Sequence, residues 1–158
     1  FIADIGFTSS LGENKELDKA KKFLIELRSE IPSLVKSSGT GGSLWQTIDD
    51  KITSAGYSNL HQKYPFSVLG HRVHECNESL GFLRLLNFGW QSYWALASRG
   101  IFGQLLNSNH EGDLTGLWAI EPHIGTQTFG AKFEEILLIE PHRVKWLEPS
   151  PQYGAGFL

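Results

Sequence analysis

The sequence predicts an α+β fold, in which helices form the first part of the chain and an antiparallel sheet forms the second. Between Asn14 and Gly56, apolar residues recur at spacings of three and four, the period of helices that bury one face. From Gly116 onward the pattern changes to short apolar runs that are typical of strands and are separated by turn residues. Helices followed by strands is the order of an α+β protein.

The composition is that of a globular protein and excludes several other classes. The 158 residues suit one domain, and a net charge of −3 provides no basic field for nucleic acid or anionic lipid. A single cysteine, Cys76, excludes an internal disulfide framework and a thiolate zinc cluster. No apolar run approaches the roughly 18 residues of a membrane span, and the first residues lack the basic region of a signal peptide. We therefore expect a cytoplasmic protein whose partners are neither nucleic acid nor membrane.

Two helices are expected in the first third of the chain. The first covers residues 14–30, where Asn14 is the cap and Pro32 ends the helix. Its buried face consists of Leu17, Ala20, Leu24, Leu27 and Ile31. After a flexible turn, Ser43 caps a second amphipathic helix, and Gly56 lies where a C-terminal glycine is common.

Four strands are expected, at residues 1–6, 116–125, 130–140 and 144–147. The first contains Asp4, a carboxylate in an apolar strand that needs a partner. Residues 57–79 are expected to be irregular. Residues 80–106 are rich in aromatic side chains, with a helix at about residues 90–99. These rings belong to the core, to a subunit interface or to the wall of a substrate cleft.

Two glutamates stand out in the predicted sheet. A hairpin centred between Gln127 and Thr128 places Glu121 directly opposite Glu134. Opposed Cβ atoms in an antiparallel pair lie roughly 4.5–5.5 Å apart, and like charges there are destabilising. The apolar neighbours of both residues weaken the screening by water. Either the two carboxylates share a proton or a cation lies between them. The alternative is a pair of surface acids on an edge hairpin.

His71 is the natural third ligand of such a cation. It follows Gly70 in a predicted loop, where a neutral imidazole can coordinate a transition metal. The alternative is a polar surface residue with no ligand. A carboxylate-rich set with one histidine favours manganese, cobalt, iron or zinc.

Four motifs, in this order, resemble those of the pita-bread metallopeptidases, the family of methionine aminopeptidase, aminopeptidase P, prolidase and creatinase. The matching segments are residues 2–6, 69–75, 117–122 and 130–136. The resemblance covers essentially the whole chain. It implies a creatinase/aminopeptidase-like fold in which helices pack on a curved antiparallel sheet. Residues 1–158 would then form one incomplete domain that lacks the family's N-terminal half.

The resemblance implies a two-metal centre. Its ligands would be Asp4, His71, Glu121 and Glu134, of which Glu134 bridges both metals. Glu135 takes the position of an acid that is not a ligand. His74 stands for a second family histidine, which contacts substrate, although the motif is shorter here. His123 replaces the usual glycine after Ile-Glu-Pro and shares a strand face with Glu121, so it faces the site or lies at the hairpin mouth.

The family's second metal aspartate has no counterpart in this chain. Residues 4–6 lead straight into residues 7–12, which resemble the sequence that follows that aspartate. A hairpin's worth of residues is therefore absent between Gly6 and Phe7. A true deletion would leave one metal or none. We favour an omission from the sequence, because losing a central hairpin would expose backbone groups of the sheet.

The function implied by the resemblance is that of a metal-dependent aminopeptidase or dipeptidase, similar to X-Pro aminopeptidases, acting on a peptide or dipeptide. Two divalent metal ions, manganese before cobalt, zinc or iron, would hold a bridging hydroxide, and the second site can be empty. Glu121 would shuttle the proton, while His74, with His123 as a further candidate, would bind the tetrahedral intermediate. The alternatives are a metal-free binding domain and a metal-free creatinase-type hydrolase. The sequence leaves open whether the chain forms a homodimer.

Overall fold

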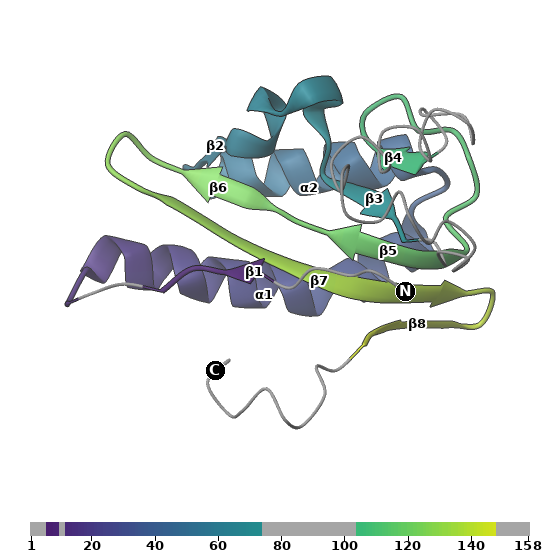
Figure 1. The fold of residues 1–158 in the computed structure, drawn as a ribbon, viewed down its shortest axis with the longest axis horizontal. Coiled ribbons are helices and arrows are strands. Elements are labelled where there is room, and N and C mark those ends of the chain that lie inside the picture. Colours follow the sequence, from purple (N-terminus) through teal and green to yellow (C-terminus); the bar gives the residue numbers. More distant parts are fainter. Residues whose placement is uncertain (1–5, 10–11, 74–103, 148–158) are drawn as a thin grey trace, which may run out of the picture.

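The computed structural model describes residues 6–9, 12–73 and 104–147 of the chain, and among these residues two α-helices lie on one face of an antiparallel sheet (Figure 1). The helices are α1 (Lys15–Ser37) and α2 (Gly41–Ser54). The strands are β1 (Gly6–Phe7), β2 (Ser58–Asn59), β3 (Gly70–Arg72), β4 (Leu105–Leu106), β5 (Gly116–Ile120), β6 (His123–Gly125), β7 (Gly130–Glu140) and β8 (Arg143–Trp146). The predicted α+β architecture is confirmed. The aromatic segment and the helix expected at residues 90–99 fall on residues outside the described ranges.

Helix α1 continues past Pro32, so the prediction that this proline ends the helix is wrong. Asn14 is the cap, as expected, and its side chain accepts a hydrogen bond of 3.0 Å from the Leu17 N–H. Proline has no N–H to donate to the carbonyl four residues earlier, which belongs to Arg28. The indole Nε1 of Trp146 in β8 donates to that carbonyl instead, at 3.0 Å. Because the orphaned acceptor is satisfied from the sheet, the helix can extend by another turn.

Removing this replacement donor should destabilise the protein. We expect Trp146→Phe to lower the free energy of unfolding by about 1–3 kcal/mol, because the partly buried carbonyl of Arg28 loses its partner. In a Pro32→Ala background, the backbone N–H that the substitution restores can donate to the same carbonyl, so Trp146→Phe should cost less. Urea unfolding of the four proteins measures both costs. An equal cost in the two backgrounds would contradict this explanation.

Helix α2 begins three residues earlier than expected, and Thr40 rather than Ser43 is its cap. The Thr40 hydroxyl accepts from the Ser43 N–H and the Ser43 hydroxyl accepts from the Thr40 N–H, both at 3.1 Å. Ser43 is thus the third residue of a capping box. Gly56 lies just past the helix with φ +83°, as its predicted role requires. The apolar faces of the two helices and the near face of the sheet form one core, which includes Leu27, Ile31, Leu44, Ile48, Trp118, Ile120 and Leu137.

Strand β7 is the centre of the sheet. The strands follow the order β2-β6-β7-β5-β3-β4, and β1 and β8 pair with the remaining edge of β7 (Figure 1). The strand expected at residues 1–6 is described only from Gly6, which is followed directly by Phe7 in β1; these residues pair with Glu134 and Phe133. The omission of residues that we expect between Gly6 and Phe7 stays a prediction. Among the described residues, no helix has the length and apolar character needed to cross a membrane.

The predicted hairpin is confirmed, including its register. Strands β5 and β6 both pair with β7, with Ile120 opposite Glu135 and His123 opposite Lys132. These pairs follow a single register, so β5 and β6 are one strand that is interrupted at residues 121–122. Gly125 pairs with the first residue of β7, which centres the turn on residues 127–128 as expected.

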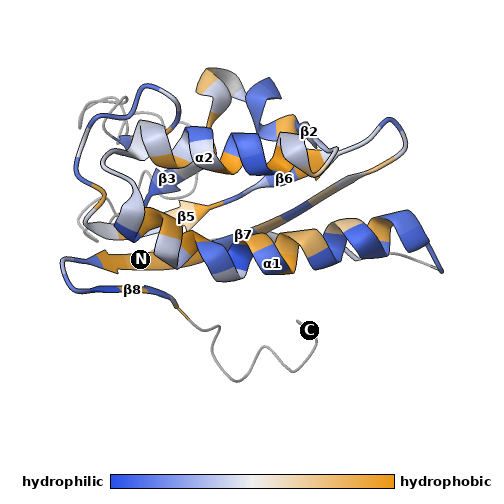
Figure 2. Cartoon of the chain, turned by 180° about the vertical axis from the view of Figure 1, so that it is seen from behind, coloured by the Kyte–Doolittle hydropathy of each residue, from blue (hydrophilic) through white to orange (hydrophobic). Residues whose placement is uncertain are grey.

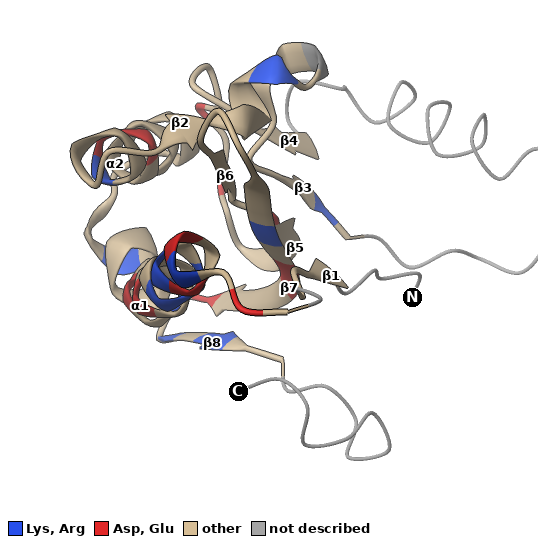
Figure 3. Cartoon of the chain, turned by 90° about the vertical axis from the view of Figure 1, so that its left-hand side faces the viewer, with Lys and Arg blue, Asp and Glu red and all other residues tan. Residues whose placement is uncertain are grey.

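The two faces of the hairpin have different surroundings. Glu135 points toward the helices, where Arg28 of α1 binds both of its carboxylate oxygens at 2.5 Å. Figure 2 is viewed from the helix side and shows β5 and much of β7 in apolar colours behind the helices. Strand alternation places Lys132, Glu134 and Ile136 on the other face, which we call the site face. Figure 3 shows α1 and α2 together on one side of the strands, so the site face is turned away from them.

Candidate functional site

Glu121 and Glu134 face each other across the site face. Glu121 follows β5, and its N–H donates to the Leu69 carbonyl at 2.8 Å, which anchors the interruption of the strand to β3. The register of the hairpin places it at the position opposite Glu134. Both side chains are largely buried, with 17% of Glu121 and 11% of Glu134 exposed. Two carboxylates so placed repel each other in a region that water screens weakly.

Lys132 is the cation between the two glutamates. Its Nζ lies 3.2 Å from Oε2 of Glu134, to which it donates a hydrogen bond, and 3.8 Å from Oε2 of Glu121. The predicted convergence of the two carboxylates is confirmed, and their common partner is a lysine ammonium. Our sequence analysis missed Lys132. Its position two residues before Glu134 on the same strand was the signal, because such residues share a face.

The environment of Lys132 favours its charged form. Burial by itself lowers the pKa of the ammonium, but the hydrogen bond to Glu134 and the charges of Glu134 and Glu121 outweigh it, so the pKa is raised. The group is therefore a fixed positive charge near neutral pH.

Tyr64 and His123 form a hydrogen-bonded pair beside this cluster. The Tyr64 hydroxyl lies 2.6 Å from Nδ1 of His123, and the ring centroids are 5.7 Å apart. Burial raises the pKa of Tyr64; Lys132 opposes this shift and the two glutamates add to it. Burial, Lys132 and Lys63 all lower the pKa of His123. A neutral imidazole that accepts from the tyrosine hydroxyl at Nδ1 carries its proton on Nε2. His123 lies opposite Lys132, on the site face as predicted.

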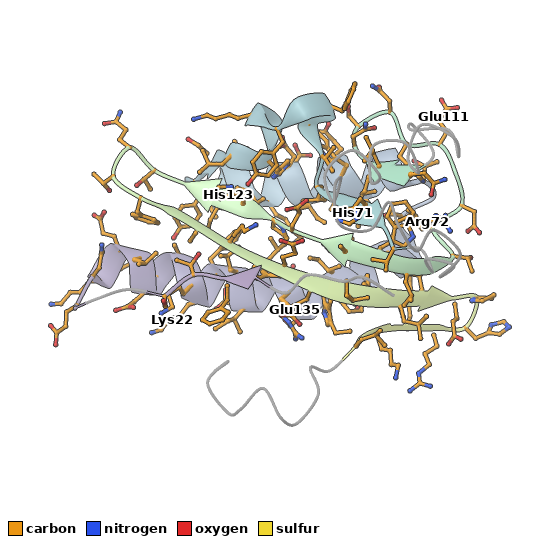
Figure 4. All side chains as sticks on the ribbon, viewed as in Figure 1. Lys22, His71, Arg72, Glu111, His123 and Glu135 are labelled. Carbon is orange, nitrogen blue, oxygen red and sulfur yellow. The ribbon has the colours of Figure 1, made fainter. Side chains whose placement is uncertain are left out.

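The structure places His71 in strand β3, not in the loop that we expected. It pairs with Ala119 of β5 and with Leu105 of β4, and its neighbours Gly70 and Arg72 also pair with β5. Ala119 precedes Glu121 by two residues, so His71 is also on the site face. Its Nδ1 lies 3.4 Å from the carbonyl oxygen of Arg72. Figure 4 shows that His71 and His123 lie apart along the sheet, at positions on β3 and β6.

The remaining predicted site residues, Asp4 and His74, lie outside the described residues. Within the described ranges, no three His, Cys, Asp or Glu side chains gather closely enough to hold a metal ion. Glu121 and Glu134 themselves fit a cation bound through carboxylate oxygens, as their shared contact with Lys132 demonstrates. Further ligands of a divalent ion would have to come from His71 after a change of side-chain position, or from Asp4.

Another histidine, His61, is fully buried near this site and was given no role by the sequence analysis. Neither ring nitrogen has a hydrogen-bond partner in the described part of the chain. The ring packs edge-on against Trp45 of α2, with centroids 5.6 Å apart, and Nε2 lies 3.8 Å from Oδ1 of Asp49. Burial lowers the pKa of His61 to about 4; Asp49 opposes this shift and His123 adds to it. The imidazole is therefore neutral in the folded protein at pH 7.

This buried histidine should make the protein sensitive to acid. Between its ordinary pKa of 6.5 and about 4, the unfolded chain binds a proton at His61 that the folded chain does not, so stability falls as the pH falls through this window. The loss amounts to about 3 kcal/mol. His61→Phe keeps a ring against Trp45 and does not titrate. Urea unfolding at pH 7 and pH 4 should show a smaller loss for this variant than for the wild type. The exposed control His142→Phe should lose as much as the wild type, and an equal loss for His61→Phe would contradict the prediction.

The fold is similar to that of a solved peptidase. The crystal structure of X-Pro aminopeptidase from Thermotoga maritima MSB8 matches with a TM-score of 0.54 and 17% sequence identity over 87% of this chain. The match spans 32% of the aminopeptidase, so this chain corresponds to about a third of its length. The sequence matches no described family profile and no curated protein. At this identity the similarity shows the fold alone, and it agrees with the expected pita-bread architecture.

Proposed function

We propose that this chain is part of a metal-dependent peptidase domain, an aminopeptidase or dipeptidase of the X-Pro aminopeptidase kind that hydrolyses N-terminal peptide bonds. One observation carries the proposal: on a sheet with that enzyme's fold, the carboxylates of Glu121 and Glu134 converge on one cation. The substrate would be a peptide or dipeptide, and the compartment the cytoplasm.

The metal ions of such an enzyme would be held by Glu121 and Glu134, with His71 and Asp4 completing the set. When bound, they would polarise the scissile carbonyl and lower the pKa of a water molecule. Two divalent ions are proposed, with manganese as the first candidate and a second site that can be empty. Carboxylate-rich sets suit this metal.

The chain's own residues would manage protons and orientation. Glu121 is partly accessible to solvent and can carry a proton at its carboxylate to the leaving amine. His123 has a lowered pKa and is hydrogen-bonded to Tyr64; in the tautomer that accepts at Nδ1, its Nε2–H can donate to an oxygen of the substrate. His74, in the family's position for the same role, lies outside the described residues.

A hydrolysis assay tests this proposal. The purified chain, loaded with Mn²⁺, should cleave Xaa-Pro dipeptides or longer peptides with proline at the second position. A chelator should abolish cleavage, and added Mn²⁺ should restore it. Metal analysis should find up to two ions per chain. Failure of the loaded chain to cleave any N-terminal peptide bond would overturn the proposal.

A domain of the same fold that binds peptides without hydrolysing them is the second candidate. It is favoured by Lys132, whose ammonium already lies between the two glutamates. Peptide binding without cleavage, with an affinity that a chelator does not change, would identify this case. A creatinase-type hydrolase would differ from both, since it would cleave its substrate in the presence of chelator.

A further inference from the structure

Lys132 is held by hydrogen bonds to its backbone and by a residue that packs over its side chain. The backbone N–H of Lys132 donates to the Thr8 hydroxyl at 2.9 Å, and that hydroxyl donates to the Lys132 carbonyl at 3.2 Å. Gly6 of β1 covers the side chain: a Cβ atom at Gly6 would lie 3.6 Å from Cε of Lys132 and 3.4 Å from Cβ of Glu134. Gly6 and Thr8 thus position this lysine against the glutamates.

The glutamate pair needs this cation. Glu134 is only 8% exposed as a residue, and its neighbours on the site face include the buried apolar residues Ile136 and Ala119. Opposed carboxylates with such neighbours repel each other strongly unless a positive charge lies between them. Lys132 supplies that charge from two residues away on the same strand, without any bound ion.

We propose that Lys132 is an internal counter-ion that competes with metal ions for Glu121 and Glu134. The ammonium contacts one oxygen of each carboxylate, and a divalent ion that bridged the same oxygens would occupy the same space. Metal binding therefore requires Lys132 to leave the pair, and the broken charge-assisted hydrogen bond lowers the metal affinity. The inference rests on the proposed function for the identity of the competitor, a divalent metal ion.

Calorimetric titration of the metal-free chain with Mn²⁺ measures this competition. Lys132→Met keeps a long unbranched side chain but removes the charge, and it should bind Mn²⁺ about 10- to 100-fold more tightly than the wild type. Lys132→Arg retains the cation and should bind like the wild type. Lys145→Met is the matched control. Lys145 is also half-buried on a strand of this sheet, and it makes no ion pair among the described residues. The affinity of this variant for Mn²⁺ should therefore equal that of the wild type. Equal affinities for Lys132→Met and the wild type would overturn the proposal.

The metal-free protein provides a second readout. In a chelating buffer, Lys132→Met should lower the melting temperature, because the glutamates lose their counter-ion, and Mn²⁺ should raise it again. In a Glu134→Gln background, Lys132→Met should lower the melting temperature by a smaller amount. An equal decrease in both backgrounds would also overturn the proposal.

The proposed peptidase activity can fail while the competition between Lys132 and the metal holds. This is the case if Lys132→Met binds Mn²⁺ more tightly than the wild type but neither protein cleaves peptides.

Discussion

Replacing Trp118 by alanine is expected to lower the free energy of unfolding by about 3–5 kcal/mol, the typical cost of truncating a fully buried aromatic side chain. Trp118 has no exposed surface, and its indole Nε1 donates to the Leu114 carbonyl at 2.7 Å. The ring of His110 packs edge-on against it at 5.3 Å, and the guanidinium of Arg72 lies 4.8 Å from the ring centroid. One side chain thus joins the core, β3 and the strand that leads to Glu121.

Urea unfolding measures this loss, and Trp118→Phe is the informative control. Phenylalanine keeps a ring in the core and loses the hydrogen bond to Leu114, so the loss should be clearly smaller than for alanine. A cost below about 1 kcal/mol for Trp118→Ala would mean that this tryptophan does not anchor β5 as the structure implies.

Glu121→Gln is expected to reduce kcat/KM for peptide hydrolysis by about 10²- to 10⁴-fold, the range that general acid–base catalysis contributes. The substitution preserves the shape of the side chain and the N–H donation to Leu69 that anchors the strand. It removes the negative charge and the proton acceptor that the proposed mechanism requires. The assay uses saturating Mn²⁺, so that a weakened metal affinity does not mask the effect on the chemical step.

The matched control for this experiment is Glu140→Gln. Glu140 is an exposed residue at the end of β7, paired with Arg143, and alternation places it on the same face as Glu134. Its replacement should leave kcat/KM unchanged. If Glu121→Gln retained the activity of the wild type, Glu121 could not be the proton carrier, whatever the fate of the metal proposal.

The sequence by itself determined the hairpin and the residues that face each other across it. Strand side chains alternate with a period of two, and the two runs of residues 116–125 and 130–140 mirror each other about residues 127–128, which predicts the register that the structure shows. The same rule placed Glu121 opposite Glu134 and His123 on the site face. These are local properties of the chain and can be predicted without knowing its distant neighbours.

Only the tertiary structure decided what those residues contact. Pro32 stops a helix by a local rule, and α1 continues because Trp146, far along the chain, donates to the carbonyl that the proline leaves without a partner. His71 is in a strand because β5 pairs with it. The cation between the glutamates is Lys132, whose ammonium is brought to both carboxylates by the register of the strands. In each case a long-range partner completes an interaction that the local sequence leaves open, because buried polar groups and charges are stable only when they are paired.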